Sequence, residues 1–295
     1  MNRLKNLIRR NPAVHRGVKT MLAWFLNLRC ARAGKPPAYI PRHLQGKFSM
    51  AGRVPILYGY ADGSKSTPLE YSGDLIKATC GRIAARELGH YRKVDQWLYD
   101  ALTAHPVNGQ QVAIMGSADQ GYGPWYECIC LEFGGKPTTI DYNPIQFGNS
   151  LIRFVKAPLK TEELGAFDAA FSISSFEHDG LGRYGDPVDP DADLKAMQQM
   201  KKLVRKGGLM FMAVPLGKDA VVYNIHRIYG RVRLPLLLKD WSVVGTFGFE
   251  DRLLDRDTGY GWDPTRFVKT GGRIVEELLH PEYPEYSPVW VLRND

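Results

Sequence analysis

The first 61 residues contain no aspartate or glutamate, although they hold twelve lysines and arginines. The rest of the chain has 27 basic and 31 acidic residues, so the net charge of +8 comes from one end. Charge gathered at one end indicates the kind of partner rather than the fold. We therefore expect a basic N-terminal segment, residues 1–61, followed by a separate α/β domain over residues 62–295.

Cysteine is scarce, and the four present, Cys30, Cys80, Cys128 and Cys130, show no zinc-site spacing. Free thiols are typical of a reducing cytoplasm, where we expect this protein. The longest apolar run of the basic segment, Met21–Leu26, is too short to span a bilayer. No nucleic-acid-binding module is recognisable, so we expect no nucleic-acid partner. The sequence also has no internal repeat and no low-complexity tract.

The basic segment has helical periodicity. Its apolar positions are Leu4, Leu7 and Ile8, then, after Pro12, Val14, Val18, Met21, Leu22 and Phe25. Lysines and arginines lie between them. A basic amphipathic helix with Trp24 and Phe25 is typical of peripheral contact with an anionic membrane surface. The alternative is a helix that packs on the domain and turns a solvated basic face outward.

A nucleotide-binding βαβ unit is predicted further along the chain. Its parts are an apolar strand (Gln111–Met115), a glycine-bearing loop (Gly116–Gly123), a helix after Pro124 (Trp125–Phe133), a second strand (Lys136–Ile140) and an acidic residue (Asp141). In such units the loop and the helix N-terminus approach the polar ligand, and the acid accepts hydrogen bonds from ribose hydroxyls. Asp141 follows Gly116 by 25 positions, close to the usual spacing of about 20.

The segment after residue 167 ends in a dense group of polar residues. An apolar strand, Asp168–Ser174, precedes Ser175, Phe176, Glu177, His178 and Asp179. An amphipathic helix over 193–204, a Lys-Gly-Gly turn and a strand over 208–214 come next. Ligands of open α/β sheets lie outside the carboxyl ends of the strands, so these polar residues predict a site.

Both blocks resemble the class I S-adenosylmethionine-dependent methyltransferases. The glycine loop, Asp141, the Phe167-Asp168 to Glu177-His178 strand end and the turn Arg205-Lys206-Gly207-Gly208 follow that superfamily's order. The runs Gly180–Pro187, Pro124–Glu127 and His226–Gly230 further resemble an uncharacterised family, domain of unknown function 268. The resemblance covers residues 55 to 295. It implies a Rossmann-like seven-stranded sheet with helices on both faces, and S-adenosyl-L-methionine as cofactor.

The glycine loop departs from the superfamily pattern. Met115 stands where an acid usually precedes the first glycine, and the glycine spacing is stretched. Cofactor binding is therefore implied more by the order of elements than by the loop itself. The residues from which we expect cofactor contacts are Gly116, Ser117, Trp125, Asp141, Tyr142, Ser175 and Phe176.

Histidines and carboxylates at the carboxyl edge are the candidate catalytic residues: His178, His226, Asp179 and Asp186. A histidine can remove the proton of a substrate hydroxyl. Alternatively, the same four residues bind a divalent metal. The residues expected to bind substrate are Arg183, Tyr184, Asn224 and Arg227, whose guanidinium groups suit a phosphate or a carboxylate. We expect Asp119 and Glu127 to be solvated or to cap the helix.

The leading interpretation is an S-adenosylmethionine-dependent methyltransferase that methylates a hydroxyl of a small molecule, sugar or glycan precursor at the cytoplasmic membrane face. A metal-dependent enzyme of sugar or phosphate chemistry that has lost the cofactor is one alternative. A non-catalytic membrane scaffold is another. The remaining predictions are structural: a linker (33–73), a helical region broken at Gly89 (75–104), a third strand (152–156), a helix (225–239), an antiparallel last pair of strands (242–247 and 288–293) and a polar loop between them (250–285).

Overall fold

The computed structural model describes residues 12–63, 68–116, 122–157, 167–257 and 287–295. The predicted contacts of Leu4, Leu7, Ile8, Ser117 and Asp119 lie outside these residues, as does most of the predicted loop 250–285. The part of that loop that is described contains the short helix η4 (Asp251–Asp255).

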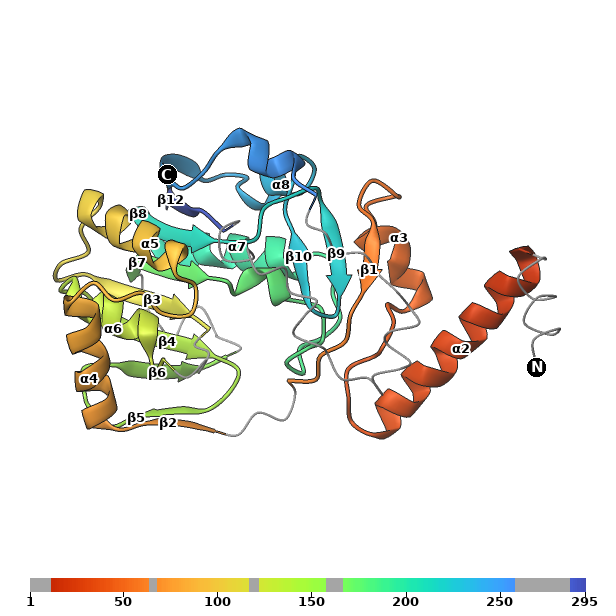
Figure 1. Cartoon of the computed structure of the whole chain (residues 1–295), viewed down its shortest axis with the longest axis horizontal. Helices are drawn as coiled ribbons and strands as arrows, with labels where there is room; N and C mark the ends of the chain where they lie inside the picture. Colours follow the sequence, from red (N-terminus) through yellow and green to blue (C-terminus); the bar gives the residue numbers. More distant parts are fainter. Residues whose placement is uncertain (1–11, 64–67, 117–121, 158–166, 258–286) are drawn as a thin grey trace.

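A seven-stranded sheet forms the centre of the molecule (Figure 1). In spatial order its strands are β11 (Ser242–Phe247), β12 (Val289–Arg293), β8 (Val204–Ala213), β7 (Phe167–Ile173), β3 (Gln111–Met115), β4 (Lys136–Asp141) and β6 (Arg153–Lys156). The five strands from β8 to β6 are parallel, whereas β12 is antiparallel to β8 and β11 to β12. The order of strands along the chain reverses between β3 and β7, which makes this pair the topological switch point.

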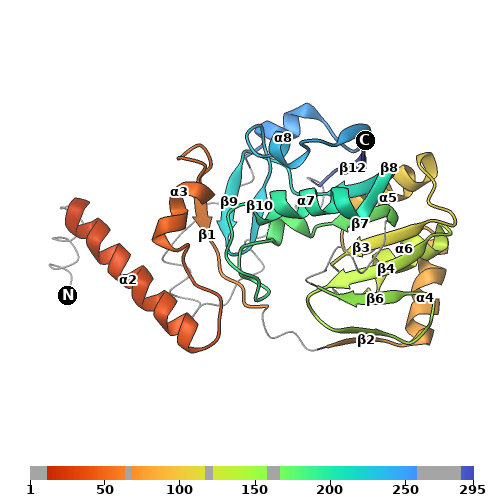
Figure 2. The ribbon, with the colours of Figure 1, turned by 180° about the vertical axis from the view of Figure 1, so that it is seen from behind.

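Helices cover both faces of the sheet, as the resemblance implies. On one face lie α4 (Gly73–Ala84), α5 (Lys93–Ala104) and α6 (Trp125–Glu132), and on the other lie α7 (Ala192–Leu203) and the short α8 (Leu234–Leu237). Figure 2 shows the same layers from behind. The three layers, the seven strands and the antiparallel last pair confirm the class I methyltransferase-like fold.

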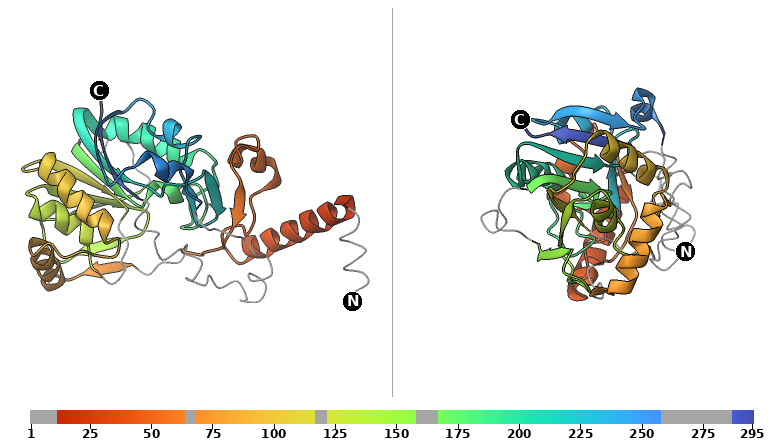
Figure 3. Two further views of the ribbon diagram at one scale, coloured as in Figure 1. Left: turned by 45° about the horizontal axis from the view of Figure 1, so that its top comes forward. Right: turned by 90° about the vertical axis from the view of Figure 1, so that its left-hand side faces the viewer.

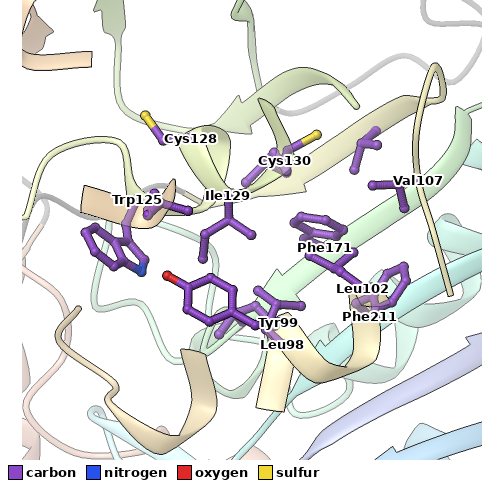
Figure 4. Packing of buried hydrophobic residues seen from close by; sticks show 14 of the residues in the cluster. Leu98, Tyr99, Leu102, Val107, Trp125, Cys128, Ile129, Cys130, Phe171 and Phe211 are labelled. Carbon is purple, nitrogen blue, oxygen red and sulfur yellow. The ribbon is translucent and has the colours of Figure 1, made fainter. Parts of the chain in front are cut away.

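The core under α5 and α6 explains why these helices form where they do. Leu98, Tyr99 and Leu102 of α5 meet Ile129 of α6, and all four are almost completely buried (Figure 4). Ser72 caps α4 by accepting a hydrogen bond from the backbone N–H of Leu75. The predicted break at Gly89 is confirmed between α4 and α5. A Cβ atom there would lie 2.7 Å from the indole of Trp125, so the helix–helix connection needs a glycine at this point.

A second, three-stranded sheet lies beside the first. It contains β1 (Ile56–Tyr58), β9 (Ala220–Tyr223) and β10 (His226–Ile228), in which β1 is parallel and β10 antiparallel to β9. Around it lie the long helix α2 (Pro12–Arg32), the short helices η1 (Arg42–Leu44) and α3 (Gln45–Phe48), and η3 (Phe176–His178) at the end of β7. A two-stranded parallel sheet joins β2 (Leu69–Tyr71) to β5 (Ile145–Phe147). Figure 3 shows α2 projecting from the side of the small sheet.

Two predictions are corrected here. Residues 33–73 are not only a linker, because they contain η1, α3, β1 and β2. The predicted helix over 225–239 is mostly wrong, because its first half forms β10 and a turn. The carboxylate of Asp219 accepts hydrogen bonds from the backbone N–H groups of Gly230, Val232 and Arg233 and so holds that turn. Pro235 then stands in the first turn of the short helix α8.

Candidate active site

A cavity of about 380 Å³ opens at the carboxyl ends of β3, β4 and β7. This is the switch point of the sheet, where ligands of open α/β folds bind. The volume falls within the range of small-molecule sites, roughly 300–1,000 Å³. The predicted residues that line the cavity are Gly116, Trp125, Asp141, Tyr142, Ser175, Phe176, His178, Asp179 and Tyr184.

Gly116, Asp141 and Ser175 come from three different strand ends and meet at the floor of the cavity. Gly116 has a φ of +71°, and a Cβ atom there would lie 3.0 Å from the Ser175 hydroxyl and 4.0 Å from Asp141 Oδ2. Only a glycine leaves this approach open. Asp141 also accepts a hydrogen bond of 2.7 Å from the backbone N–H of Asn143, which fixes the end of β4.

Aromatic side chains form much of the wall. Phe176 and Trp125 are buried, with 2% and 6% of their surface exposed, whereas Tyr142 is 48% exposed at the mouth. Four aromatic residues of the wall were not predicted and come from the α4–α5 connection and the start of α6: His90, Tyr91, Tyr122 and Tyr126. No periodicity separates such residues from core residues, so sequence reasoning had no signal for them.

His178 stands at the wall with one ring nitrogen already engaged. Its Nδ1 lies 2.6 Å from the carbonyl oxygen of Ile225, and a carbonyl only accepts, so Nδ1 carries the proton. Nε2 therefore presents a lone pair. Burial, followed by the charge of Arg183, lowers the pKa of His178 to about 3, so the ring is neutral at pH 7.

Glu177 lies next to this imidazole. Its Oε1 accepts a hydrogen bond of 2.6 Å from the hydroxyl of Ser174 and lies 3.8 Å from His178 Nε2. The residue is fully buried, and this burial raises its pKa to about 7 despite the hydrogen bond from Ser174. The neighbouring Asp179 lines the cavity, and burial raises its pKa well above the ordinary value. The end of β7 thus carries one carboxyl group, that of Glu177, whose protonation changes near neutrality.

Two predicted catalytic residues lie elsewhere. His226 belongs to β10, is 1% exposed and is not among the residues that line the cavity, although its ring centroid is 6.3 Å from that of His178. Asp186 accepts hydrogen bonds from the backbone N–H groups of Gly182 and Tyr184 and shapes its own loop. In the part of the chain that the structure describes, no group of three or more His, Cys, Asp or Glu residues is placed to hold a metal, so the alternative set of His178, Asp179, Asp186 and His226 does not form one.

Two predicted substrate-binding residues are structural. Arg227 is fully buried, and its guanidinium donates to the backbone carbonyls of Asp179, Asp189 and Pro190, because the loop after η3 wraps around it. Asn224 is also fully buried and exchanges two hydrogen bonds with the backbone of Ala61. From sequence alone, an arginine and an asparagine in a polar motif suggest the rim of a binding site. The backbone carbonyls to which these two side chains donate belong to segments far away along the chain, so the sequence does not reveal these hydrogen bonds.

Arg183 and Tyr184 remain near the mouth of the cavity. The Arg183 guanidinium lies 5.1 Å from the centroid of the Tyr184 ring, a cation–π distance. Tyr184 also packs edge-on against His178, with 5.9 Å between ring centroids. Tyr184 lines the cavity, whereas Arg183 is not among the lining residues.

The described wall of the cavity contains acidic residues but no lysine or arginine. Glu127, Asp141 and Asp179 line it, and none of the described lining residues is a lysine or an arginine. Glu127 was expected to be solvated or to act as a cap, but it is 1% exposed, and its Oε1 accepts a hydrogen bond of 2.7 Å from Thr139. Carboxyl groups and aromatic faces together favour a cationic ligand.

Residues 113–255 match the model of a family described as "Caenorhabditis protein of unknown function, DUF268". The DUF268 resemblance is confirmed over these residues. They contain most of β3 and all of β4, β7, η3 and β10, and so nearly all of the cavity wall. No curated protein sequence matches the chain.

Several solved structures are similar to this chain. One is a chain from the Haloferax volcanii complex that contains the methyltransferase activator Trm112, with 14% identity, a TM-score of 0.43, and coverage of 75% of this chain and 97% of that one. Another is the N-methyltransferase NodS from Bradyrhizobium japonicum WM9 with S-adenosyl-L-homocysteine, with 13% identity, a TM-score of 0.39 and coverage of 73% and 98%. A third is an S-adenosylmethionine-dependent methyltransferase from Clostridium acetobutylicum, with 8% identity, a TM-score of 0.40 and coverage of 75% and 98%. The fold assignment rests on the strand order of the sheet and not on these likenesses.

Proposed function

We propose that this protein is an S-adenosylmethionine-dependent methyltransferase that acts on a hydroxyl group. The observation that carries the proposal is the set of side chains that line the cavity at the switch point. Three carboxyl groups and several aromatic rings line it, and the described lining includes no lysine or arginine. S-adenosylmethionine carries a sulfonium and an ammonium group, and both are favoured by carboxylates and aromatic faces.

The residues present fit this cofactor. Asp141 stands at the end of β4, where an acid accepts hydrogen bonds from ribose hydroxyls. Gly116 leaves the backbone of the first loop open to a close approach. Phe176 and Trp125 offer faces for an adenine ring, and Glu127 offers a carboxyl group for the ammonium. The cofactor supplies an activated methyl group.

His178 is the base that we propose for the acceptor. Its Nε2 has a lone pair, because Nδ1 is held by the carbonyl of Ile225. The bound cofactor would supply the methyl group to the acceptor oxygen, and Nε2 of His178 would take the proton that this hydroxyl loses. In its ionised form, Glu177, 3.8 Å away, stabilises the imidazolium. S-adenosyl-L-homocysteine and the methyl ether are the products.

The acceptor that best suits this cavity has no charge on the part that enters the cavity. A phosphate or carboxylate at the reacting end would meet Asp179 and no lysine or arginine among the described lining residues. We therefore propose the hydroxyl of a sugar or glycan precursor, with any phosphate kept outside the cavity. Aromatic residues at the mouth, Tyr142 and Tyr184, supply flat apolar faces for a sugar ring. The membrane location is predicted from the N-terminal segment, and the reaction is proposed from the residues of the cavity. The two proposals therefore depend on different residues.

Calorimetric titration with S-adenosyl-L-homocysteine tests the proposal. We expect micromolar binding to the full chain, lost in Asp141→Ala and kept in Asp100→Ala, which alters an exposed carboxylate on α5. Absence of binding to the folded wild-type protein overturns the methyltransferase proposal and favours a scaffold. Equal binding by the Asp141→Ala variant overturns the placement of the ribose.

A further inference from the structure

Helix α2 carries a group of large apolar side chains that no part of the described chain covers. Met21 is 65% exposed, Leu22 54%, Trp24 64% and Phe25 51%. Exposed apolar residues scattered singly are ordinary, but four within five positions on one helix form a patch. We call these four residues the α2 patch.

The opposite side of the same helix attaches it to the molecule. Asn27 exchanges two hydrogen bonds of 2.9 Å with the backbone of Tyr39, and Cys30 lies 3.9 Å from the hydroxyl of Tyr60. A residue advances by about 100° around a helix, so Cys30, nine positions after Met21, lies on the far side from it. The α2 patch is therefore centred on the side of α2 away from the one that holds Cys30 against Tyr60.

The charge around the patch indicates what covers it. Residues 1–61 contain twelve basic and no acidic residues, and Arg29 and Arg32 are exposed in the last turn of α2. A second copy would bring the same excess of positive charge against this helix, which opposes pairing of two α2 helices. An anionic surface instead gains from both the charge and the apolar side chains.

The length and composition of α2 set how it meets such a surface. No described helix is long and apolar enough to cross a membrane. A 21-residue helix is about 30 Å long and can lie flat on a bilayer. Tryptophan and phenylalanine on one side and arginine beside them are the composition of helices that lie in the interface plane.

We propose that the α2 patch inserts into the headgroup region of an anionic lipid bilayer, with Arg29 and Arg32 next to the lipid phosphates. This surface is distinct from the cavity, and the proposal does not depend on the methyltransferase reaction. In this proposal the N-terminal segment holds the protein at a membrane surface, and α2 lies in the plane of the membrane rather than across it.

Co-sedimentation of the full chain with vesicles tests the proposal. We expect binding to vesicles of phosphatidylcholine with 30% phosphatidylserine, chosen to represent an anionic leaflet, at least tenfold stronger than to phosphatidylcholine alone. Binding should weaken as salt is raised from about 0.05 to 0.5 M, because the Debye length shortens. The double variant Trp24→Ser, Phe25→Ser should lose binding at all salt concentrations.

Two controls separate lipid insertion by α2 from non-specific apolar adhesion and from self-association. Leu151→Ser removes an apolar side chain that is 63% exposed away from α2, and it should bind vesicles as the wild type does. Sedimentation velocity without lipid measures self-association. Failure to bind anionic vesicles overturns the proposal, as does a lipid-free dimer that the Trp24→Ser, Phe25→Ser double variant abolishes.

Discussion

Arg233 donates two hydrogen bonds to the buried carboxylate of Asp193, from Nε at 2.9 Å and from Nη2 at 2.5 Å. Arg227 approaches the same carboxylate, with 3.7 Å between Nε and Oδ1, and the Tyr229 hydroxyl donates to it at 2.9 Å. Burial alone would raise the pKa of Asp193, but the two guanidinium groups and the hydroxyl hold it below its ordinary value. One carboxylate thus joins α7 to β10 and to the turn before α8.

Replacing Asp193 by Asn should destabilise the protein strongly. The change leaves two buried guanidinium groups without their counter-charge, and breaking a buried ion pair costs about 3–5 kcal/mol. Urea unfolding at pH 7 measures this loss. Asp191→Asn, which changes an exposed carboxylate two positions away, is the matched control and should differ from wild type by less than about 0.5 kcal/mol.

His178→Asn and His226→Asn form a pair that separates the proposed base, His178, from the neighbouring histidine. Loss of a general base lowers kcat by about 10²–10⁴-fold, and we expect this for His178→Asn with S-adenosyl-L-homocysteine binding retained. His226→Asn should change kcat only a few-fold in the fraction that still binds this ligand, because His226 does not line the cavity. Equal losses in both variants would contradict the assigned base.

Glu177→Gln should alter how stability depends on pH. Burial raises the pKa of Glu177 to about 7 from an ordinary value of 4.5, so between these pH values the folded state holds a proton that the unfolded state has released. Wild-type stability therefore falls as pH rises through this window, by about 3 kcal/mol from this residue. The difference in unfolding free energy, variant minus wild type, should be larger at pH 8 than at pH 5. A difference that is constant across this range excludes the raised pKa.

Replacing either of two glycines by alanine should lower the free energy of unfolding, but by different amounts, although both glycines have the same backbone conformation. Gly180 and Gly207 have φ of +71° and +76°, but a Cβ atom at Gly180 would lie 2.1 Å from the carbonyl oxygen of Asp189, and one at Gly207 would meet nothing within 4 Å. Gly207→Ala should cost about 1–2 kcal/mol for the left-handed backbone alone. Gly180→Ala should cost clearly more, because the loop around Arg227 cannot close. Urea unfolding of both variants compares them.

Local patterns predicted the central sheet well. The strand Gln111–Met115 has its predicted bounds, and the other strands of this sheet start or end within a few residues of the predicted positions. These elements follow from apolar runs, glycine turns and amphipathic spacing, all of which are local signals. Asp141 and most of the polar residues after β7 line the cavity, as the sequence predicted. The prediction succeeds because the topology brings the carboxyl ends of parallel strands together.

The small sheet was not predictable by the same means. Strand β1 has three residues and β10 has three, and β9 pairs with a segment 165 positions earlier in the chain, Ile56 with Val221. No local pattern marks strands this short, so the surrounding residues suggested a linker and a helix. Arg227 and Asn224 were misassigned for a related reason, since their partners lie in segments whose proximity only the folded chain creates.

The separation of β1 from β9 has a consequence for synthesis. A ribosome adds about 5–20 residues per second, so β1 waits roughly 8 to 33 seconds for its partner strand to be made. During that interval the small sheet cannot close, and the segment that carries α2 is held by no finished domain. Helix α2 is made before any of the residues that line the cavity. Under the membrane proposal, the surface that contacts lipid is thus complete before the cavity is.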